Sequence, residues 1–453
     1  MNKKLEIFKS LMRSRAVTVL GIGISNAPLI DFLLSIGAMV TARDKKTEAE
    51  LGEEARKLRD LGVNLICGEK YLDNLTGDYI FKTPGMRFDI PELEAARSSG
   101  SIVTSEMEVF FDLCPAPIIA VTGSDGKTTT TTLICKILTA AGYKCRLGGN
   151  IGNPLLPQIE GIEPSELIVL ELSSFQLHTL KKSPHIAVVT NISPNHLDMH
   201  KSYKEYIAAK KNIILHQTES DTAVLNCDNA PTHAFAADTC GKALFFGHDN
   251  TSDAFYDRES IYLHGKKILD RKDIPLCGDH NAENLMAAML ATESYVSIDC
   301  VRSVARTFRG VEHRAEFVRE KDGVRYYNSS IDSSPNRTRS TLSLFEQKVI
   351  LISGGKDKGI PYDDLGEALA EKVKTLILIG KTAPLIHNAL KNTSHANEID
   401  VYYCDTYEQV VSKANEIATA GDIVLLSPAS TSFDMFKNFE ERGRLFKELV
   451  NAL

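Results

Sequence analysis

A glycine-rich stretch near residue 120 has the residue types and the order that hold a phosphate. The apolar segment 118–122 runs into Gly123, Ser124, Asp125, Gly126, Lys127, Thr128 and Thr129. Glycines let backbone N–H groups turn towards an anion, and a helix that starts here adds partial positive charge. The lysine of such a loop contacts the β- and γ-phosphates, and the following hydroxyl holds Mg²⁺. The spacing G-x-x-G-K-T is shorter than the common G-x-x-x-x-G-K-[ST]. The alternative is a glycine turn with an incidental lysine. The agreement of strand, loop, Lys-Thr pair and helix disfavours this alternative.

Three further polar residues lie where a metal-dependent phosphoryl transfer could use them. Glu171 ends another apolar run, and a carboxylate there could share a Mg²⁺ ion with Thr128. His196 follows the next apolar run and could be a metal ligand, a phosphate contact or a turn histidine. Lys210 lies in a helical stretch, where a solvated lysine is the ordinary interpretation.

These residues must be positioned by short apolar runs, which end in glycine, serine or another polar residue. Helical stretches lie between many of the runs. Such alternation is typical of parallel sheets that are covered on both faces and that bind ligands at the carboxyl ends of their strands. The runs are residues 17–21, 118–123, 167–171, 187–190, 349–354, 376–380 and 423–427. The pattern therefore predicts an α/β fold.

The length of 453 residues suggests about three domains. Pro115 and Pro117 precede a fresh strand, and near Gly310 a helical stretch gives way to strand-like segments. We predict domains at residues 1–106, 107–311 and 312–453. The first and third are expected to be Rossmann-like, and the central one to be a parallel sheet of the P-loop ATPase type.

The composition excludes several classes of protein. Lys and Arg total 52 against 59 Asp and Glu, and the formal charge of −7 argues against a general nucleic-acid coat. No apolar run approaches the ~18 residues of a membrane helix. The apolar run after Arg15 is interrupted by glycines, which favours a buried strand over a signal peptide. The nine cysteines form no C-x-x-C pair and fit a reducing compartment. We expect a cytoplasmic monomer that binds neither nucleic acid nor a membrane.

A second glycine turn lies near the N-terminus. Gly21 and Gly23 follow the first predicted strand, and Asp44 ends the next one. This arrangement is similar to a dinucleotide-binding fingerprint, except that Asn26 replaces its third glycine. It predicts a nucleotide-binding turn of the Rossmann type and gives NAD only weak support.

Several of these motifs resemble those of the Mur ligases and of the related folylpolyglutamate synthetases, which use ATP to join an amino acid to a carboxylate. Residues 123–129 match the family loop G-[TS]-[ND]-G-K-[TS], and residues 191–198 match N-x-[ST]-x-[DN]-H-x-D. The resemblance covers nearly the whole chain, with the domain order intact.

The resemblance implies that ATP and two Mg²⁺ ions bind in the central domain. Matching positions imply nucleotide contacts by Gly123, Ser124, Asp125, Gly126, Lys127, Thr128, Thr129, Asn281, Asn284 and Arg314. They imply metal ligation by Thr128, Glu171, His196 and a carbamylated Lys210; Lys127, Glu171, His196 and Lys210 would form the catalytic set. Carbamylation has a physical reason, because Mg²⁺ repels an ammonium but binds the oxyanion that a neutral amine forms with carbon dioxide.

Residues 427–443 are similar to the S-P-A-x-x-S-x-D-x-F-x-x-[FY]-x-x-R-G segment of the family members that add D-glutamate to UDP-N-acetylmuramoyl-L-alanine. Matching positions imply contacts to this precursor by Ile24, Ser25, Asp44, Lys45, Thr83, Gly85, Asn150, Ser173 and Gln176. They imply contacts to D-glutamate by Ser333, Lys358, Ser432, Phe433 and Phe439. We therefore expect an ATP-dependent ligase of peptidoglycan precursor synthesis that works through an acyl phosphate.

One segment departs from the family pattern. Where the family has N-D-S-K-A-T-N, residues 328–334 read N-S-S-I-D-S-S. The aspartate expected at the ATP ribose falls on Ser329, and Asp332 is a candidate substitute at a different position. We expect weaker ATP binding or a different hinge geometry. Two alternatives stay open: an amide ligase that adds another amino acid, and a non-catalytic nucleotide-binding relative.

Overall fold

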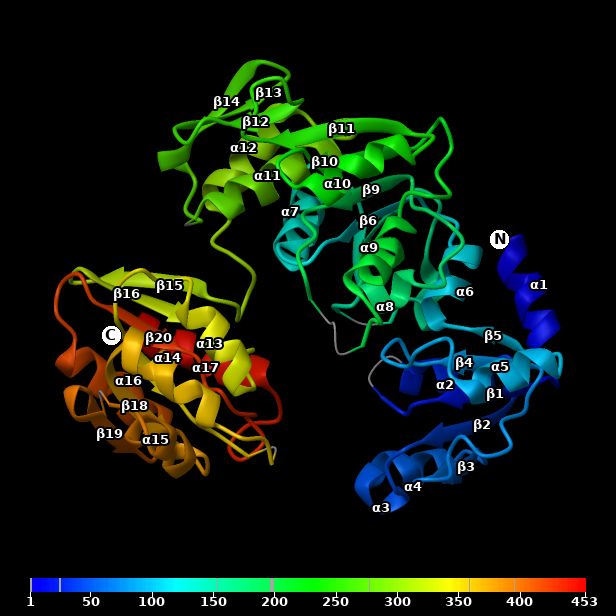
Figure 1. Ribbon diagram of the computed structural model, residues 1–453, viewed down its shortest axis with the longest axis horizontal. Helices are drawn as coiled ribbons and strands as arrows, with labels where there is room; N and C mark the ends of the chain where they lie inside the picture. The colour runs from blue at the N-terminus through cyan, green and yellow to red at the C-terminus, as the bar shows by residue number, and fades with distance from the viewer. Residues whose placement is uncertain are drawn as a thin grey trace. The chain divides into compact units, whose positions relative to one another are not determined.

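The computed structural model describes the whole chain apart from Met1, Ile24, Ser25, Asn153, residues 196–198, Cys277, Lys358 and His395. The chain folds into two compact units, Met1–Phe308 and Arg309–Leu453 (Figure 1). The first unit holds a five-stranded and a nine-stranded sheet, and the second holds a six-stranded sheet. The expected α/β fold with parallel-rich sheets is confirmed, whereas the three-domain division at 106/107 and 311/312 stays a prediction.

The first sheet has five parallel strands in the order β3-β2-β1-β4-β5. Their bounds are β1 Ala16–Leu20, β2 Met39–Asp44, β3 Asn64–Cys67, β4 Tyr79–Lys82 and β5 Ile102–Thr104. The helices are α1 Lys3–Met12, α2 Asn26–Ser35, α3 Glu48–Leu51, α4 Glu53–Asp60, α5 Pro91–Ser98 and α6 Glu106–Leu113. Since β1 and β4 are neighbours, the turns that follow them meet, and Thr83 N–H donates to the carbonyl of Leu20 at 3.1 Å.

The second sheet has nine strands in the order β14-β13-β12-β11-β10-β9-β6-β8-β7. Their bounds are β6 Ile118–Thr122, β7 Cys145–Gly149, β8 Leu167–Glu171, β9 Ile186–Val189, β10 Thr222–Asn226, β11 Lys242–Gly247, β12 Ala254–Tyr256, β13 Ser260–Leu263 and β14 Lys266–Asp270. The strands from β7 to β12 are parallel, and the antiparallel strands β13 and β14 close the sheet at one end. The sequence runs anticipated the buried central strands but not this hairpin, whose strands are half polar.

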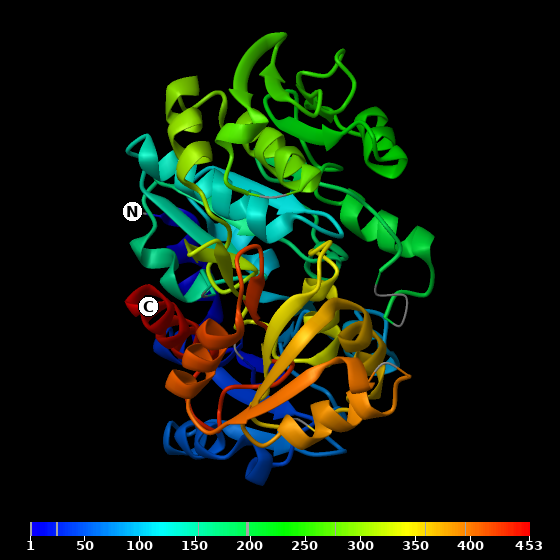
Figure 2. The same cartoon turned by 90° about the vertical axis from the view of Figure 1, so that its left-hand side faces the viewer.

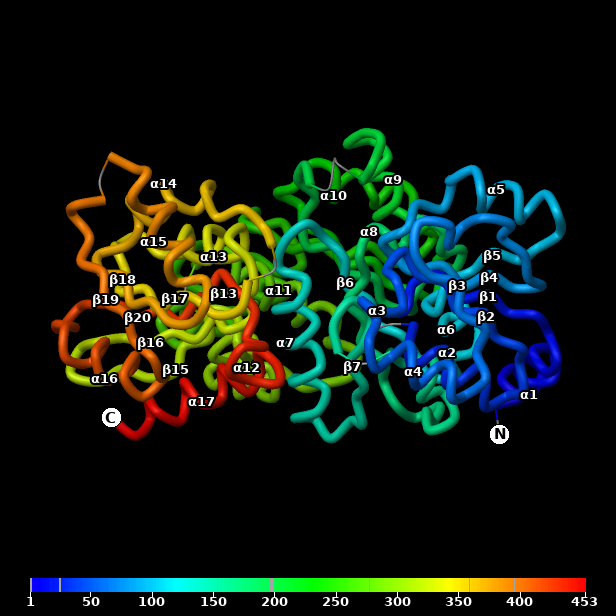
Figure 3. The backbone as a smooth tube through the Cα atoms, turned by 90° about the horizontal axis from the view of Figure 1, so that it is seen from below, coloured from blue at the N-terminus to red at the C-terminus, as the bar shows by residue number. Residues whose placement is uncertain are grey.

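The helices of this part are α7 Lys127–Ala140, α8 Ser174–Leu177, α9 Tyr203–Lys211, α10 Ala230–Ala234, α11 Asp279–Thr292 and α12 Ile298–Thr307, with the 3₁₀ helix η1 at Leu156–Gly161. Helices α7 and α11 lie side by side (Figures 1 and 3). The central strand β6 is buried along its whole length between β8 and β9. Because these three strands run in the same direction, the residues that follow them gather at one edge of the sheet.

The third sheet has the order β15-β16-β20-β17-β18-β19, and only β15 runs antiparallel to its neighbour. The strands are β15 Glu316–Lys321, β16 Val324–Asn328, β17 Val349–Ser353, β18 Val373–Ile379, β19 Asp400–Cys404 and β20 Ile423–Leu426. The helices are α13 Pro335–Leu342, α14 Gly366–Lys372, α15 Ala383–Lys391, α16 Tyr407–Ile417 and α17 Phe439–Ala452. Figure 2 shows this sheet in yellow to red with its helices.

Each face of the third sheet has its own apolar core. Leu351, Leu376 and Leu425 pack with residues of α14 and α15, whereas Ile350 and Val424 pack with residues of α16 and α17. This alternation is what a strand buried on both faces produces. In the described part of the chain, no helix is both long enough and apolar enough to cross a lipid bilayer.

Candidate active site

The loop after β6 has room for glycine only at its two glycine positions. Gly123 and Gly126 have φ angles of +153° and +78°. A Cβ atom on Gly123 would collide with Oγ1 of Thr190, which follows β9, and one on Gly126 would collide with Oδ1 of Asn284 on α11. The loop is therefore wedged between the end of β9 and the start of α11, which fixes its path.

Helix α7 begins directly after this loop without a side-chain cap. Gly126 is its N-cap residue and makes no side-chain cap hydrogen bond. The N–H groups of a first helical turn have no partner within the helix, and they carry partial positive charge. Lys127 Nζ turns back over the loop and donates to the carbonyls of Gly123 and Ser124 at 3.0 and 2.9 Å. This geometry agrees with the phosphate-binding loop that the sequence predicts, and phosphate binding itself stays a prediction.

A buried hydrogen-bonded chain leads away from Thr128. Its Oγ1 donates to Oε2 of Glu171 at 2.7 Å, and Nδ2 of Asn150 donates to Oε1 of the same carboxylate at 2.8 Å. Thr128 is 8% exposed and Glu171 is 2% exposed. The backbone N–H of Asn150 also donates to the carbonyl of Glu171 at 2.8 Å. A carboxylate and a hydroxyl are thus in contact at the loop, and both are oxygen ligands that Mg²⁺ accepts.

Lys210 is buried rather than solvated. Helix α9 presents it to the same loop, where Nζ donates to the carbonyl of Gly123 at 2.7 Å and to Oγ1 of Thr122 at 3.3 Å. Its ammonium lies 4.8 Å from the centre of the Tyr206 ring. Burial, and after it the charge of Lys127, hold the pKa of Lys210 well below its usual range. The interpretation as a solvated helix lysine is therefore wrong.

The segment after β9 braces the loop. The carbonyl and Oδ1 of Asn191 accept hydrogen bonds from the N–H groups of Ser124 and Asp125, at 2.8 and 3.0 Å. Oγ of Ser124 contacts the Tyr206 hydroxyl at 3.0 Å. His196 lies outside the described residues. Within the described residues, no group of three or more His, Cys, Asp or Glu side chains could hold a metal. The four-residue metal set implied by the resemblance stays a prediction.

The two asparagines implied for the adenine are placed differently from each other. Asn284 is 4% exposed; its Oδ1 accepts from Thr130 Oγ1 at 3.1 Å, and its Nδ2 donates to Asn281 Oδ1 at 3.2 Å. Asn284 therefore joins α11 to α7 from within, whereas Asn281 at the start of α11 is half-buried. The adenine contact stays a prediction for both.

The carboxylate of Asp44 is hydrogen-bonded to backbone N–H groups within the first unit. Its two carboxylate oxygens accept from the N–H of Ile22 at 2.6 Å and from the N–H of Lys46 at 2.8 Å, so it fixes the glycine turn after β1. Lys45 is exposed beside it, and Thr83 lies against Gly21. Gly85 follows two residues after Thr83, and Ile24 and Ser25 lie outside the described residues. Precursor contacts by these residues stay predictions.

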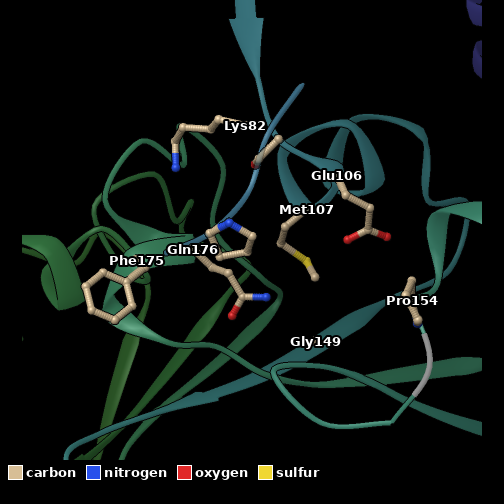
Figure 4. Close-up of a pocket in the computed structure, with 9 residues that line it drawn as sticks. Lys82, Glu106, Met107, Gly149, Pro154, Phe175 and Gln176 are labelled. Carbon is tan, nitrogen blue, oxygen red and sulfur yellow. The ribbon is translucent and has the colours of Figure 1, made fainter. Parts of the chain in front are cut away.

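One of the implied precursor residues, Gln176, lines a small pocket in the first unit together with residues that the sequence did not single out (Figure 4). Its lining consists of Lys82, Pro84, Ser105, Glu106, Met107, Gly149, Pro154, Phe175 and Gln176. Gln176 was expected here; Ser173 caps α8, where its Oγ accepts from the N–H of Gln176 at 3.3 Å. Lys82 and Glu106 were missed, because nothing in the local sequence marks a charged residue as buried. Burial lowers the pKa of Lys82 and raises that of Glu106 to about 7.

The residues that the resemblance implies for D-glutamate belong to the second unit. Ser432 is buried and Phe433 is exposed, while Phe439 packs edge-on against His313 with ring centres 5.9 Å apart. Oγ of Ser333 donates to the carbonyl of Ile331 at 3.3 Å. Lys358 lies outside the described residues, and Arg314 is exposed.

Asp332 does not face solvent. It is 4% exposed, and Oδ2 accepts from Ser427 Oγ at 2.7 Å. Burial raises its pKa. Ser329, which stands where the family has an aspartate, accepts the N–H of Ala315 at 3.1 Å. Both residues thus hold the second unit together from within, and compensation at the ATP ribose stays a prediction.

Known proteins resemble this chain over its whole length. The family model described as "Mur ligase middle domain" matches residues 121–292, and "Mur ligase, glutamate ligase domain" matches residues 313–430. The UDP-N-acetylmuramoylalanine–D-glutamate ligase of Ruminiclostridium cellulolyticum is 53% identical over 100% of both chains. The ligase of the same name from Acetivibrio thermocellus is 52% identical, again over 100% of both chains.

Solved structures share the fold at much lower identity. The UDP-N-acetylmuramate–alanine ligase of Thermotoga maritima has a TM-score of 0.56 at 19% identity and covers 97% of this chain and 99% of its own. The MurF protein of Acinetobacter baumannii has a TM-score of 0.54 at 16% identity and covers 98% of this chain and 92% of its own. With two domain models and full-length relatives at about half identity in agreement, the chain belongs to the Mur ligase family.

Proposed function

We propose that this protein is an ATP-dependent ligase of peptidoglycan precursor synthesis that joins D-glutamate to UDP-N-acetylmuramoyl-L-alanine. The full-length similarity to ligases of that name supports the substrates. The observation that carries the chemistry is the contact between Thr128 and Glu171 beside the uncapped start of α7. Phosphoryl transfer needs such oxygen ligands next to a phosphate-binding loop.

The residues of the loop fit a triphosphate with Mg²⁺. Because Gly123 and Gly126 have no Cβ, the loop can pack closely against Thr190 and Asn284 and take the turn that leads into the start of α7. Thr128 and Glu171 would hold one Mg²⁺ ion, and His196 and a carbamylated Lys210 would serve the second. When bound, Mg²⁺ supplies positive charge that neutralises the phosphates. Lys127 would add a further positive charge beside the γ-phosphate.

The proposed reaction has three steps. The precursor carboxylate attacks the γ-phosphorus of ATP, which gives an acyl phosphate and ADP. The amine of D-glutamate then attacks the acyl carbon, and the tetrahedral intermediate expels phosphate. The protein's part is to orient the two acids and to offset charge, with Lys127 at the phosphates and Gln176 at the precursor. Ser432 and Lys358 of the second unit would bind D-glutamate.

Coupled phosphate release tests this function. Release should require ATP, the UDP-precursor and D-glutamate together, and L-alanine or a diamino acid should not replace D-glutamate. Lys127→Ala should lower the rate by at least about 100-fold, since it removes a charge next to the reacting phosphate. Lys136→Ala, an exposed lysine on the same helix, is the matched control and should keep wild-type activity.

A non-catalytic nucleotide-binding relative is the second candidate, favoured by the loss of the family aspartate at Ser329. Under this alternative the protein would bind ATP yet release no phosphate with any substrate pair. The activity described above would exclude it. We further propose that the enzyme works as a cytoplasmic monomer; size-exclusion chromatography with light scattering tests the oligomeric state.

A further inference from the structure

Arg442 is the largest fully buried side chain among the described residues, and the proposed function gives it no contact. It lies in the first part of α17, is 1% exposed, and belongs to the segment 427–443. Its Nη1 donates to the carbonyl of Ser430 at 3.1 Å. Its Nη2 donates to the carbonyl of Ser330 at 2.8 Å, and its Nε donates to Oγ of the same serine at 2.9 Å. One guanidinium thus joins α17 to the loops that follow β20 and β16.

The bond to Ser430 fixes the backbone next to Ser432. Ser430 is 1% exposed, and its Oγ contacts Oγ1 of Thr382 at 2.7 Å. The preceding residue, Ala429, has a φ of +57°, in the left-handed region that side chains other than glycine rarely adopt. Such a conformation persists only where surrounding contacts hold it. The bond from Arg442 is one of these contacts, and it lies two residues before Ser432.

The bonds to Ser330 fix the start of α17 at Phe439. Oγ of Ser330 accepts from Nε of Arg442 and donates to the carbonyl of Phe439 at 2.8 Å. Ser330 is fully buried, and Phe439 is half-buried. Phe439 and Ser432 are two of the residues that the resemblance implies for D-glutamate. Both of them therefore lie next to groups that the same guanidinium holds.

The shape of a guanidinium suits these three bonds. Its donors lie in one plane and point in fixed directions, whereas a lysine ammonium is a compact charge that reaches only part of the same acceptors. Burial lowers the pKa of Arg442, and Tyr407, Asp434 and Asp332 oppose this shift. An arginine side chain keeps its charge in proteins, and a buried charge is costly unless its donors are satisfied. The acceptors on both loops are thus tied firmly to Arg442.

We propose that Arg442 is a positioning residue of the amino-acid site: it fastens the loops after β16 and β20 to the start of α17 and thereby holds Ser432 and Phe439 in place for the amino-acid substrate. It acts through Ser330 and Ser430 rather than by contact with the substrate. The inference rests on the proposed function for its kinetic consequence. Its structural consequence is measurable without any substrate.

The kinetic test compares the wild type with Arg442→Lys, which keeps the charge and removes the planar set of donors. We expect the KM for D-glutamate to rise at least about tenfold, because charged hydrogen bonds to the loops are lost. The KM values for ATP and the UDP-precursor should change by less than about twofold. Phosphate release is measured against the concentration of each substrate in turn. Equal changes in all three KM values, or an unchanged KM for D-glutamate, would overturn the proposal.

Arg43→Lys is the matched control, since Arg43 on β2 is 4% exposed and also donates to backbone carbonyls, those of Asp73 at 2.8 Å and Tyr71 at 3.2 Å. This variant should lower the urea midpoint of unfolding, as Arg442→Lys does, yet keep the wild-type KM for D-glutamate. A KM for D-glutamate that rises equally in both variants would overturn the proposal, because lost stability would then be the cause.

Ser330→Ala keeps the arginine and serves as the test if Arg442→Lys does not fold. It removes the hydroxyl between Nε of Arg442 and the carbonyl of Phe439. The KM for D-glutamate should rise about threefold or more, and the KM for ATP should stay at the wild-type value. An unchanged KM for D-glutamate in this variant would overturn the proposal.

Hydrogen exchange of the free protein tests the structural step. The N–H of Thr431 donates to the carbonyl of Lys356 at 3.2 Å, and the N–H of Lys356 donates back to Thr431 at 2.8 Å, so both amides report on the loop next to Ser430. They should exchange at least about fivefold faster in Arg442→Lys than in the wild type, and no faster in Arg43→Lys. Equal exchange in Arg442→Lys and the wild type would overturn the proposal. Faster exchange in a protein that releases no phosphate with D-glutamate would contradict the proposed function and support the positioning role.

Discussion

Lys127 and Lys210 reach the same piece of backbone, since both ammonium groups donate to the carbonyl of Gly123, at 3.0 and 2.7 Å. Like charges in a water-poor site repel, and Lys127 accordingly contributes to the low pKa of Lys210 after burial. A lysine in this state gives up its proton readily and becomes a nucleophile. The two lysines therefore differ in chemistry although they share a partner: Lys210 is the one suited to take up carbon dioxide.

This argument predicts a carbamate on Lys210. We expect Lys210→Ala to slow phosphate release by at least about 100-fold, and short carboxylic acids such as acetate to restore part of the rate by supplying the missing oxygens. Release is measured against acetate concentration. Lys211→Ala is the control, because the neighbouring side chain is paired with Asp238 at 2.8 Å and should respond to neither change. A folded Lys210→Ala variant that acetate leaves inactive would argue against the carbamate.

At the scale of elements, the phosphate loop is shaped by its neighbours on both sides. Thr190 after β9 and Asn284 on α11 occupy the space that side chains at Gly123 and Gly126 would need. Asn284 also accepts a hydrogen bond from Thr130 on α7. The same side chain therefore packs against the loop and joins the two helices. The loop geometry is thus a property of three elements that are distant in the chain.

A comparison of Gly126→Ala with Gly142→Ala separates the effect of this packing from the effect of backbone strain. Gly142→Ala, at the end of α7, has a positive φ of +91° and meets nothing within 4 Å, so it should lose about 1 kcal/mol of unfolding free energy and keep its activity. Gly126→Ala combines positive φ with the collision against Asn284, and phosphate release should fall by about 100-fold or more. Urea denaturation and phosphate release measure the two effects. Equal behaviour of the two variants would refute the role assigned to the collision.

At the scale of the first unit, a charged cluster ties the first sheet to the second. Arg87, which follows β4, donates to Asp89 at 2.8 Å, to Glu205 on α9 at 2.9 Å and to the carbonyl of Met199 at 2.6 Å. Its guanidinium holds the pKa of Glu205 at about 2 and that of Asp89 well below its usual range. Because Glu205 lies on the helix of Lys210, this cluster links the turn after β4 to the helix that contacts the loop after β6.

The depressed pKa values give a stability prediction with a definite sign. A carboxyl group whose pKa is lower in the folded protein than in the unfolded chain stabilises the folded protein at pH values above the unfolded pKa, which is about 4.5 for Glu205. This contribution is lost as the pH falls towards 2. Arg87→Met should therefore lower the unfolding free energy by about 2 kcal/mol at pH 7 and by progressively less below pH 4.5. Arg15→Met breaks an exposed pair with Asp78 and should change it by less than about 1 kcal/mol. A difference that grows as the pH falls would contradict this assignment.

Glu106 makes the opposite contribution to the stability of the whole unit. Its pKa is raised from 4.5 to about 7 in the folded state, so the folded protein holds this proton more tightly than the unfolded chain. Between pH 4.5 and 7 the unfolding free energy therefore decreases as the pH rises. Glu106→Gln should make the unfolding free energy less dependent on pH in this window, as measured by urea titrations. An unchanged slope would show that Glu106 does not titrate there.

Much of the architecture could be predicted from the order of amino acids. The central strands β6, β8 and β9, the start of α7 after Gly126 and the position of Glu171 at a strand end all follow from apolar runs and the glycine spacing. These features depend on neighbours in the chain, because strand and loop conformations are local requirements. For the same reason the order of residues 118–129 is enough to predict a phosphate loop.

Other features needed the tertiary structure. The burial of Lys210, Lys82 and Glu106 depends on elements from separate parts of the chain, and a charged residue carries no local mark of its burial. Asp44 and Asp332 are likewise bonded inside their own units, in contacts that the resemblance did not imply. The chain order can say which groups are present and where strands end. Which groups lose their water, and so change their pKa, is decided only when distant segments pack together.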